Sequence, residues 1–150
     1  MKKSHYGKFF LMLGASYIVM YCVMYLNVAE FSHVYIGLTR LYMTALMVAP
    51  MALIMLGFMG SMYTNKRTNT LIIGGSVAAF VTVLILLRTQ TFVGDEQYMQ
   101  AMIPHHSSAI LVSSEANLKD PEVQKLARDI IDAQEREIAQ MKAILARMKK

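Results

Sequence analysis

This sequence lacks most of the residue patterns that mark soluble enzymes. Its one cysteine, Cys22, has no partner for a disulfide within the chain. No glycine-rich loop suited to a phosphate group, no cysteine and histidine cluster with zinc spacing, and no serine, histidine and aspartate grouping is present. Strand-like alternation is also missing from the last third of the chain. We therefore expect an all-α protein that is not an enzyme.

Charged residues are missing from three long stretches of the 150-residue chain, which is 55% hydrophobic overall. These stretches are residues 9–28, 41–63 and 71–87. Each is close to the length that an α-helix needs to cross about 30 Å of hydrocarbon. The pattern predicts three transmembrane helices, at residues 9–28, 41–63 and 71–88.

The net charge of +5 does not indicate nucleic-acid binding, because the basic excess lies around the apolar stretches. Residues 1–94 hold seven basic residues and one acidic residue, whereas residues 95–150 hold eight basic and nine acidic residues. The basic residues precede the first stretch and fill the second connection: Lys2, Lys3, Lys8, Lys66 and Arg67. The positive-inside rule then predicts a cytoplasmic N-terminus and an extracytoplasmic tail. In a bacterium, this is a multi-pass inner-membrane protein with a periplasmic tail.

The chain is expected to divide into a membrane domain, residues 1–90, and a helical hairpin, residues 91–150. The hairpin's helices are predicted at residues 95–117 and 120–148. Asp95 is the expected N-cap of the first, and Asp120 followed by Pro121 opens the second.

The second tail helix carries an apolar seam at alternating spacings of four and three residues. Its members are Val123, Ala127, Ile130, Gln134, Glu137, Met141, Ile144 and Met148. Leu126, Ile131, Ile138 and Leu145 widen this apolar face. Two members, Gln134 and Glu137, are unsuited to a plain core, because an unpaired buried carboxylate costs several kcal/mol. We therefore expect Glu137 to have a partner or to contact water.

The first tail helix has a seam that includes Met99, Met102 and His106, which fall within roughly 60° of one another at about 100° per residue. His105 points about 100° away from His106. Pro104 removes the hydrogen bond to the carbonyl of Gln100 and is expected to bend the helix. Antiparallel packing would bring Gln134, Glu137 and Met141 opposite this segment.

Thioether and imidazole groups with a nearby carboxylate favour a soft transition metal ion, above all Cu(I), over calcium or magnesium. Such a site also avoids thiols, which are oxidised outside the cytoplasm. The alternative is that the methionines only fill gaps in the seam and His106 is a hydrogen-bonded core histidine. Spacing alone leaves both interpretations open.

The tail resembles the family catalogued as domain of unknown function 305. The similar stretches are MIPHHSSAI at residues 102–110 and KDPEVQKLARDIIDAQEREIAQM at residues 119–141. The resemblance implies a ferritin-like helical hairpin that binds copper in the periplasm or contributes to metal resistance. It implies as metal-site residues Met102, His105, His106, Gln134, Glu137 and Met141, with Asp95 and Met99 as weaker additions.

The sequence departs from the family pattern at several positions. Val112 stands where many relatives have another methionine, Ser107 and Ser108 replace a Gln-Gly pair, and Ile144 replaces a common tryptophan. Di-iron oxidase chemistry is not expected, because such sites need a Glu-x-x-His motif from each of two helices and residues 91–150 contain none.

Two helices of this length bury too little surface to form an independent domain. A homodimer forming a four-helix bundle would solve this, and packing onto the membrane helices is the alternative. The leading interpretation is a membrane-anchored copper protein for storage, buffering or handover; the rival is a hairpin that only mediates oligomerisation. The methionines at four-residue intervals from Met43 to Met59 are expected to face lipid or other helices. His33, between the first two stretches, could approach the tail but is expected to be a solvated loop residue.

Overall fold

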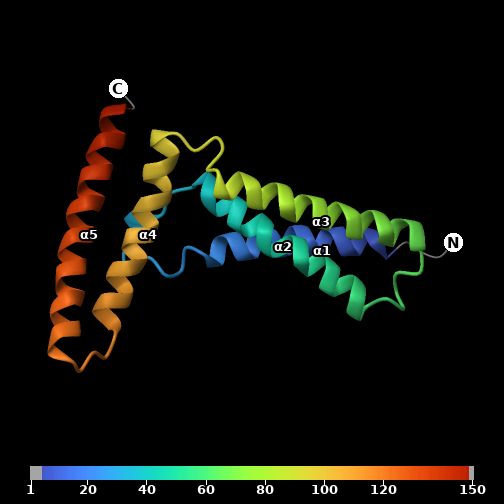
Figure 1. The fold of residues 1–150 in the computed structure, drawn as a ribbon, viewed down its shortest axis with the longest axis horizontal. Helices are drawn as coiled ribbons and strands as arrows, with labels where there is room; N and C mark the ends of the chain where they lie inside the picture. Colours follow the sequence, from blue (N-terminus) through green and yellow to red (C-terminus); the bar gives the residue numbers. More distant parts are fainter. Residues whose placement is uncertain (1–4, 149–150) are drawn as a thin grey trace. The chain divides into compact units, whose positions relative to one another are not determined.

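The structure is a computed structural model that describes residues 5–148. It contains five α-helices and one short 3-10 helix, in the order α1 (Tyr6–Val23), η1 (Phe31–His33), α2 (Leu38–Phe58), α3 (Lys66–Arg88), α4 (Asp95–Glu115) and α5 (Pro121–Met148) (Figure 1). No strand occurs among these described residues, which confirms the all-α prediction for them. Lys2 and Lys3, on which part of the expected topology rests, lie outside the described residues.

Helices α1, α2 and α3 are long and apolar enough to cross a membrane. Their bounds differ from the predicted ones. α1 ends at Val23 rather than at residue 28, because the chain turns after Val23 into a loop that is grouped with residues 92–150 and not with α1. α3 begins at Lys66, five residues before its apolar stretch, because the Asn65 side chain caps it by accepting a hydrogen bond from Thr68 N–H at 3.1 Å.

The chain divides into two compact units. The first consists of residues 1–23 and 39–91, and its core joins Phe9 of α1, Ala52 and Leu56 of α2, and Ile72 of α3 around Tyr63. Few side chains on these helices are buried inside the structure, as expected for helices that lipid surrounds. No methionine of the row from Met43 to Met59 is fully buried, which agrees with a lipid-facing or packing role.

The second unit combines residues 92–150 with residues 24–38, the loop between α1 and α2. We call residues 24–38 the α1–α2 loop. The sequence favoured a solvated loop over one that approaches the tail. The structure instead groups this loop with the tail. The second unit therefore has three parts: α4, α5 and the α1–α2 loop.

Helices α4 and α5 lie side by side and run in opposite directions (Figure 1), and they pack around Met99, Ile103, Ile138 and Leu145. The predicted seam is wrong at its ends, since Val123 and Met148 are 44% and 47% exposed. The buried positions of α5 are Ala127, which belongs to the predicted seam, and Ile138 and Leu145, which were predicted to widen its apolar face. An α-helix has 3.6 residues per turn, so a stripe drawn at 3.5-residue spacing drifts off the buried face by about 20° per heptad.

The two predicted caps of the tail helices differ in outcome. Gly94, not Asp95, is the N-cap of α4, and Asp95 lies in the first turn, where its negative charge still suits the helix dipole. Asp120 caps α5 as predicted: its Oδ1 accepts hydrogen bonds from Glu122 N–H at 2.9 Å and Val123 N–H at 3.1 Å.

The first prediction follows from this cap. The Asp120→Ala variant should lose about 1 kcal/mol of local stability at the start of α5, because two backbone N–H groups lose their acceptor. Amide hydrogen exchange at Glu122 and Val123 should then be about fivefold faster in the full-length protein. Asp132→Ala, at an exposed position within the same helix, is the control and should leave these two amides unchanged. Equal exchange in the two variants would show that the cap contributes nothing.

Candidate metal centre

His106 lies midway along α4 with 8% of its surface exposed. Its Nε2 atom is 2.6 Å from Glu137 Oε2 on α5. The Glu137 side chain is itself 53% exposed, so water reaches the carboxylate from the other side. The expectation that Glu137 needs a partner or water is confirmed, and its partner is His106.

The second ring nitrogen of His106, Nδ1, is buried and has no hydrogen-bond partner among the described residues 5–148. A carboxylate accepts hydrogen bonds, so the neutral imidazole that suits this contact carries its proton on Nε2. Nδ1 then holds a lone pair that faces no donor. Buried polar atoms without a partner are rare in proteins, and a lone pair of this kind is the group by which histidine binds metal ions.

The three methionines predicted for the site have different environments. Met99 is buried in the cluster between α4 and α5, and Met141 of α5 packs against the same cluster. Met102 is half-buried, four residues before His106 and so about one turn away on the same side of α4. The structure thus brings Met99 and Met141 to one cluster, with His106 in contact with Glu137.

Two other predicted residues, His105 and Gln134, are less buried than His106. His105 is exposed, with its ring centroid 6.1 Å from that of His106 and the two planes inclined by 62°. This agrees with the angular separation of the two histidines along the helix. Gln134 is half-buried on α5, three residues before Glu137.

No three histidine, cysteine, aspartate or glutamate side chains in the described part of the chain, residues 5–148, gather closely enough to hold a metal ion. The predicted donor set adds methionine sulfur to imidazole, whereas hard ions such as calcium take six to eight oxygen ligands.

Ser107, the residue after His106, attaches the α1–α2 loop to α4. It is fully buried, and its Oγ accepts a hydrogen bond from Ala29 N–H at 2.8 Å. The same Oγ lies 2.9 Å from Nδ1 of His33. His33 is only 7% exposed, so the expectation of a solvated loop histidine is wrong.

Further contacts hold the α1–α2 loop along the helix pair. Leu38 N–H donates to Gln97 Oε1 at 3.4 Å, and Lys142 Nζ donates to Ser32 Oγ at 3.1 Å. At Gly37, an added Cβ would lie 3.5 Å from Cα of Ala101, so the loop backbone runs against α4. The loop therefore covers the stretch of α4 from Gln97 to Ser107, where the candidate ligands lie.

Burial lowers the pKa of His33 from its usual value of 6.5, and the nearby Lys142 ammonium lowers it further, whereas Glu30 opposes both. Glu30 Oε2 is 3.5 Å from His33 Nε2. The folded protein thus favours neutral His33 more than the unfolded chain does.

Two comparisons with known proteins found similarities. Residues 79–149 match the family described as "Domain of unknown function (DUF305)". An uncharacterized protein of Acanthamoeba polyphaga mimivirus is 35% identical over 138 residues, which cover 90% of this chain and 89% of the viral protein. That match extends well beyond residues 79–149 into the apolar helices. No solved structure matches the chain.

A second prediction concerns Ser107. Replacing it with alanine removes the acceptor of the partly buried Ala29 N–H hydrogen bond, a loss worth about 0.5–1.5 kcal/mol. In the Ser107→Ala variant, the amides of residues 24–38 should exchange faster, while those of α5 change little. Ser114→Ala, at an exposed position on α4, is the control. Unchanged protection of the α1–α2 loop in Ser107→Ala would mean that this attachment does not hold the loop.

A third prediction concerns pH. Because the folded-state pKa of His33 is lowered, its contribution to stability is complete above pH 6.5, where both states are neutral. It is lost as the pH falls from 6.5 toward the lowered folded-state value, since the unfolded chain takes up the proton first. The difference in Tm between pH 7.5 and pH 5.5 should be larger for the wild type than for His33→Gln. Other titrating groups are common to both proteins, so an equal difference would refute this role of His33.

Proposed function

We propose that this chain, which belongs to the DUF305 family, is a membrane-anchored protein that binds a soft transition metal ion, above all copper. Its role would be storage, buffering or handover of the metal, without catalysis. The observation that carries the proposal is His106: one nitrogen meets Glu137, and the other is buried without a partner.

In this proposal, Nδ1 of His106 and the sulfur atoms of Met99, Met102 and Met141 would hold the ion. Imidazole together with thioether groups is a donor set that stabilises Cu(I). The sequence suggested Glu137 as a ligand of the metal ion, and here it has a different role. It would orient the imidazole and raise its basicity through Nε2, as carboxylates behind metal-bound histidines do, rather than bind the ion itself.

The expected placement of the chain in the membrane belongs to the same proposal. Lys8 at the start of α1 and Lys66 and Arg67 at the start of α3 favour the cytoplasmic side for these ends. The α4–α5 pair and the α1–α2 loop would then lie on the opposite, extracytoplasmic side, the periplasm if the source is bacterial. A site without thiols suits such an oxidising compartment.

A second copy of the chain is the partner that we propose for the helix pair. Val112, Val123 and Leu126, near the connection between α4 and α5, are 65%, 44% and 57% exposed. Burying them in a ferritin-like four-helix bundle would remove apolar surface from water. The same residues favour the rival function, a structural module that only mediates oligomerisation, in which Met99 and Met141 serve as core residues.

A titration with Cu(I) distinguishes the two functions and is the fourth prediction. The full-length protein in detergent, kept under reducing conditions, should take Cu(I) from a competing coloured chelator. His106→Ala should weaken binding at least about tenfold, and Glu137→Gln should weaken it by about 10–100-fold, because the histidine loses its orienting partner. Met102→Leu, which keeps the apolar volume, should also weaken binding.

His105→Ala is the matched comparison, since it removes an exposed histidine from the neighbouring position. Its affinity should stay close to that of the wild type. If His106→Ala and His105→Ala bind Cu(I) equally well, the metal proposal fails. Retention of the oligomer in such variants would then support the oligomerisation module.

A further inference from the structure

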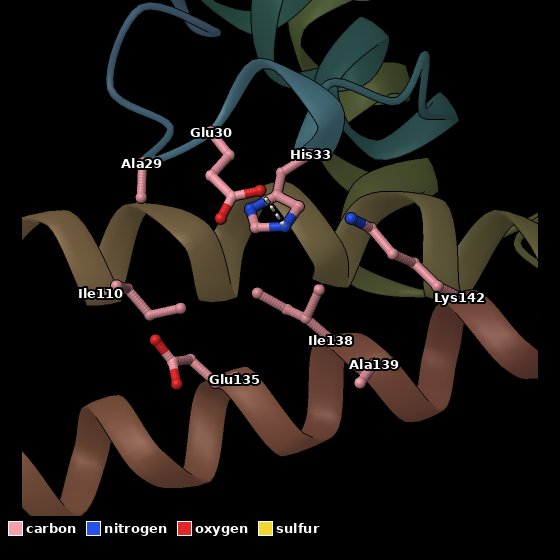
Figure 2. A pocket seen from close by; sticks show the side chains of 8 residues that line it. All are labelled: Ala29, Glu30, His33, Ile110, Glu135, Ile138, Ala139 and Lys142. Atoms are coloured by element: carbon pink, nitrogen blue, oxygen red, sulfur yellow. Dashed lines mark ion pairs between the residues drawn. The ribbon is translucent and has the colours of Figure 1, made fainter.

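A cavity of about 300 Å³ lies beside the α1–α2 loop and away from His106. Ala29, Glu30 and His33 of the loop form one wall, and Ile110 of α4 contributes to the floor (Figure 2). The opposite wall comes from α5, with Glu135, Ile138, Ala139 and Lys142. All of these residues belong to the second unit. The metal proposal leaves this cavity unused.

The charged groups of the cavity are separated. Glu135 and Lys142 are seven residues apart, about two turns or roughly 10 Å along one side of α5. Figure 2 shows Glu135 toward one end, Lys142 at the other, and Ile138 and Ala139 between them. Within the described residues, neither side chain forms an ion pair, and the one hydrogen bond of Lys142 goes to the neutral hydroxyl of Ser32.

Glu30 adds a second carboxylate on the loop side, where it accepts a hydrogen bond from Ser32 Oγ at 3.0 Å. Its neighbour His33 is held neutral by burial, so the acidic part of the cavity is not compensated there. The cavity thus offers carboxylates near one end, an apolar middle and an ammonium group at the other end.

This arrangement selects for a dipolar ligand. An anion alone would meet Glu30 and Glu135, and a cation alone would leave Lys142 without a counter-charge. A molecule with an ammonium group and a phosphate or carboxylate group, joined by a short carbon chain, would pair with both ends and cover Ile138. We propose that the cavity binds a phosphoethanolamine group, with its ammonium at Glu135 and its phosphate at Lys142.

The loop indicates the source of this group. Ala29 lies six residues after the end of α1 at Val23, and His33 lies five residues before the start of α2 at Leu38. Both helices are apolar enough to span a membrane, so the wall of the cavity is built from a short connection between two membrane segments. The phosphoethanolamine group is therefore that of the lipid phosphatidylethanolamine. This assignment rests on the proposed membrane anchoring and is independent of metal binding.

The fifth prediction tests the lipid. The full-length protein is purified with equal amounts of phosphatidylethanolamine and phosphatidylcholine, and the retained lipids are counted by native mass spectrometry. The wild type should retain phosphatidylethanolamine roughly fivefold over phosphatidylcholine, a ratio that one additional hydrogen bond supplies. A primary ammonium donates hydrogen bonds to Glu135, whereas the quaternary ammonium of phosphatidylcholine has no N–H group.

Two variants separate the two ends of the ligand. Glu135→Gln should abolish the preference between the lipids, and Lys142→Gln should lower retention of both, because both carry a phosphate. Glu122→Gln and Lys119→Gln, at exposed positions outside the cavity, are the matched controls and should behave as the wild type. A wild type without preference, or Glu135→Gln that matches Glu122→Gln, would overturn the site.

Free O-phosphoethanolamine distinguishes the sources. It is added to the protein in phosphatidylcholine nanodiscs, and binding is followed by chemical shifts of labelled residues 24–38. The lipid assignment predicts no saturation at millimolar concentration, because the free molecule lacks the anchoring acyl chains. Saturation that depends on Glu135 would overturn the lipid source and assign the cavity to a soluble molecule of the same chemistry. Cu(I) affinity should be the same with either lipid, so failure here leaves the metal proposal intact.

Discussion

The contact between His106 Nε2 and Glu137 Oε2 is the interaction on which the second unit depends. It joins α4 to α5 at a polar point beside an otherwise apolar interface. It also determines which nitrogen of His106 carries a free lone pair. A carboxylate acceptor favours the proton on Nε2, so the lone pair is on Nδ1. The packing of two helices and the chemical character of the candidate site thus follow from one short contact.

The next residue along α4 extends this arrangement in another direction. His106 and Ser107 are consecutive, so their side chains leave the helix about 100° apart and reach different neighbours. His106 meets α5, and Ser107 meets Ala29 and His33 of the α1–α2 loop. Two adjacent positions therefore hold all three parts of the unit together. The small buried side chain of Ser107 leaves space for the loop to approach.

The helix pair alone buries too little surface to be stable, which led to the expectation of a dimer or of packing onto the membrane helices. The structure adds a third contributor, since the α1–α2 loop covers α4 from Gln97 to Ser107. This loop is connected by the chain to α1 and α2 directly. The unit that carries the candidate metal and lipid sites is thus built from both ends of the sequence.

Much of the candidate site could be predicted from local regularities. Fixed helical geometry was enough to separate His105, which is exposed, from His106, which is buried. The cost of burying a carboxylate was enough to predict that Glu137 has a partner or contacts water. The same reasoning was wrong where small errors accumulate, as in the seam of α5, where Val123 and Met148 are exposed while Ile138 and Leu145 are buried.

The sequence by itself determined the helices, their apolar or amphipathic character and the facial order of side chains within each, because these depend on contacts between residues close in the chain. Only the tertiary structure decided that His33 is buried against Ser107 and that Glu30, Glu135 and Lys142 line one cavity. It also decided that Nδ1 of His106 has no hydrogen-bond partner in the part of the chain that the structure describes. The burial of His33 and the cavity bring loop residues next to residues 70 or more positions later in the chain. The third feature is the lack of a hydrogen bond to one atom. No periodic pattern records such pairings, since they arise when separate elements pack in three dimensions.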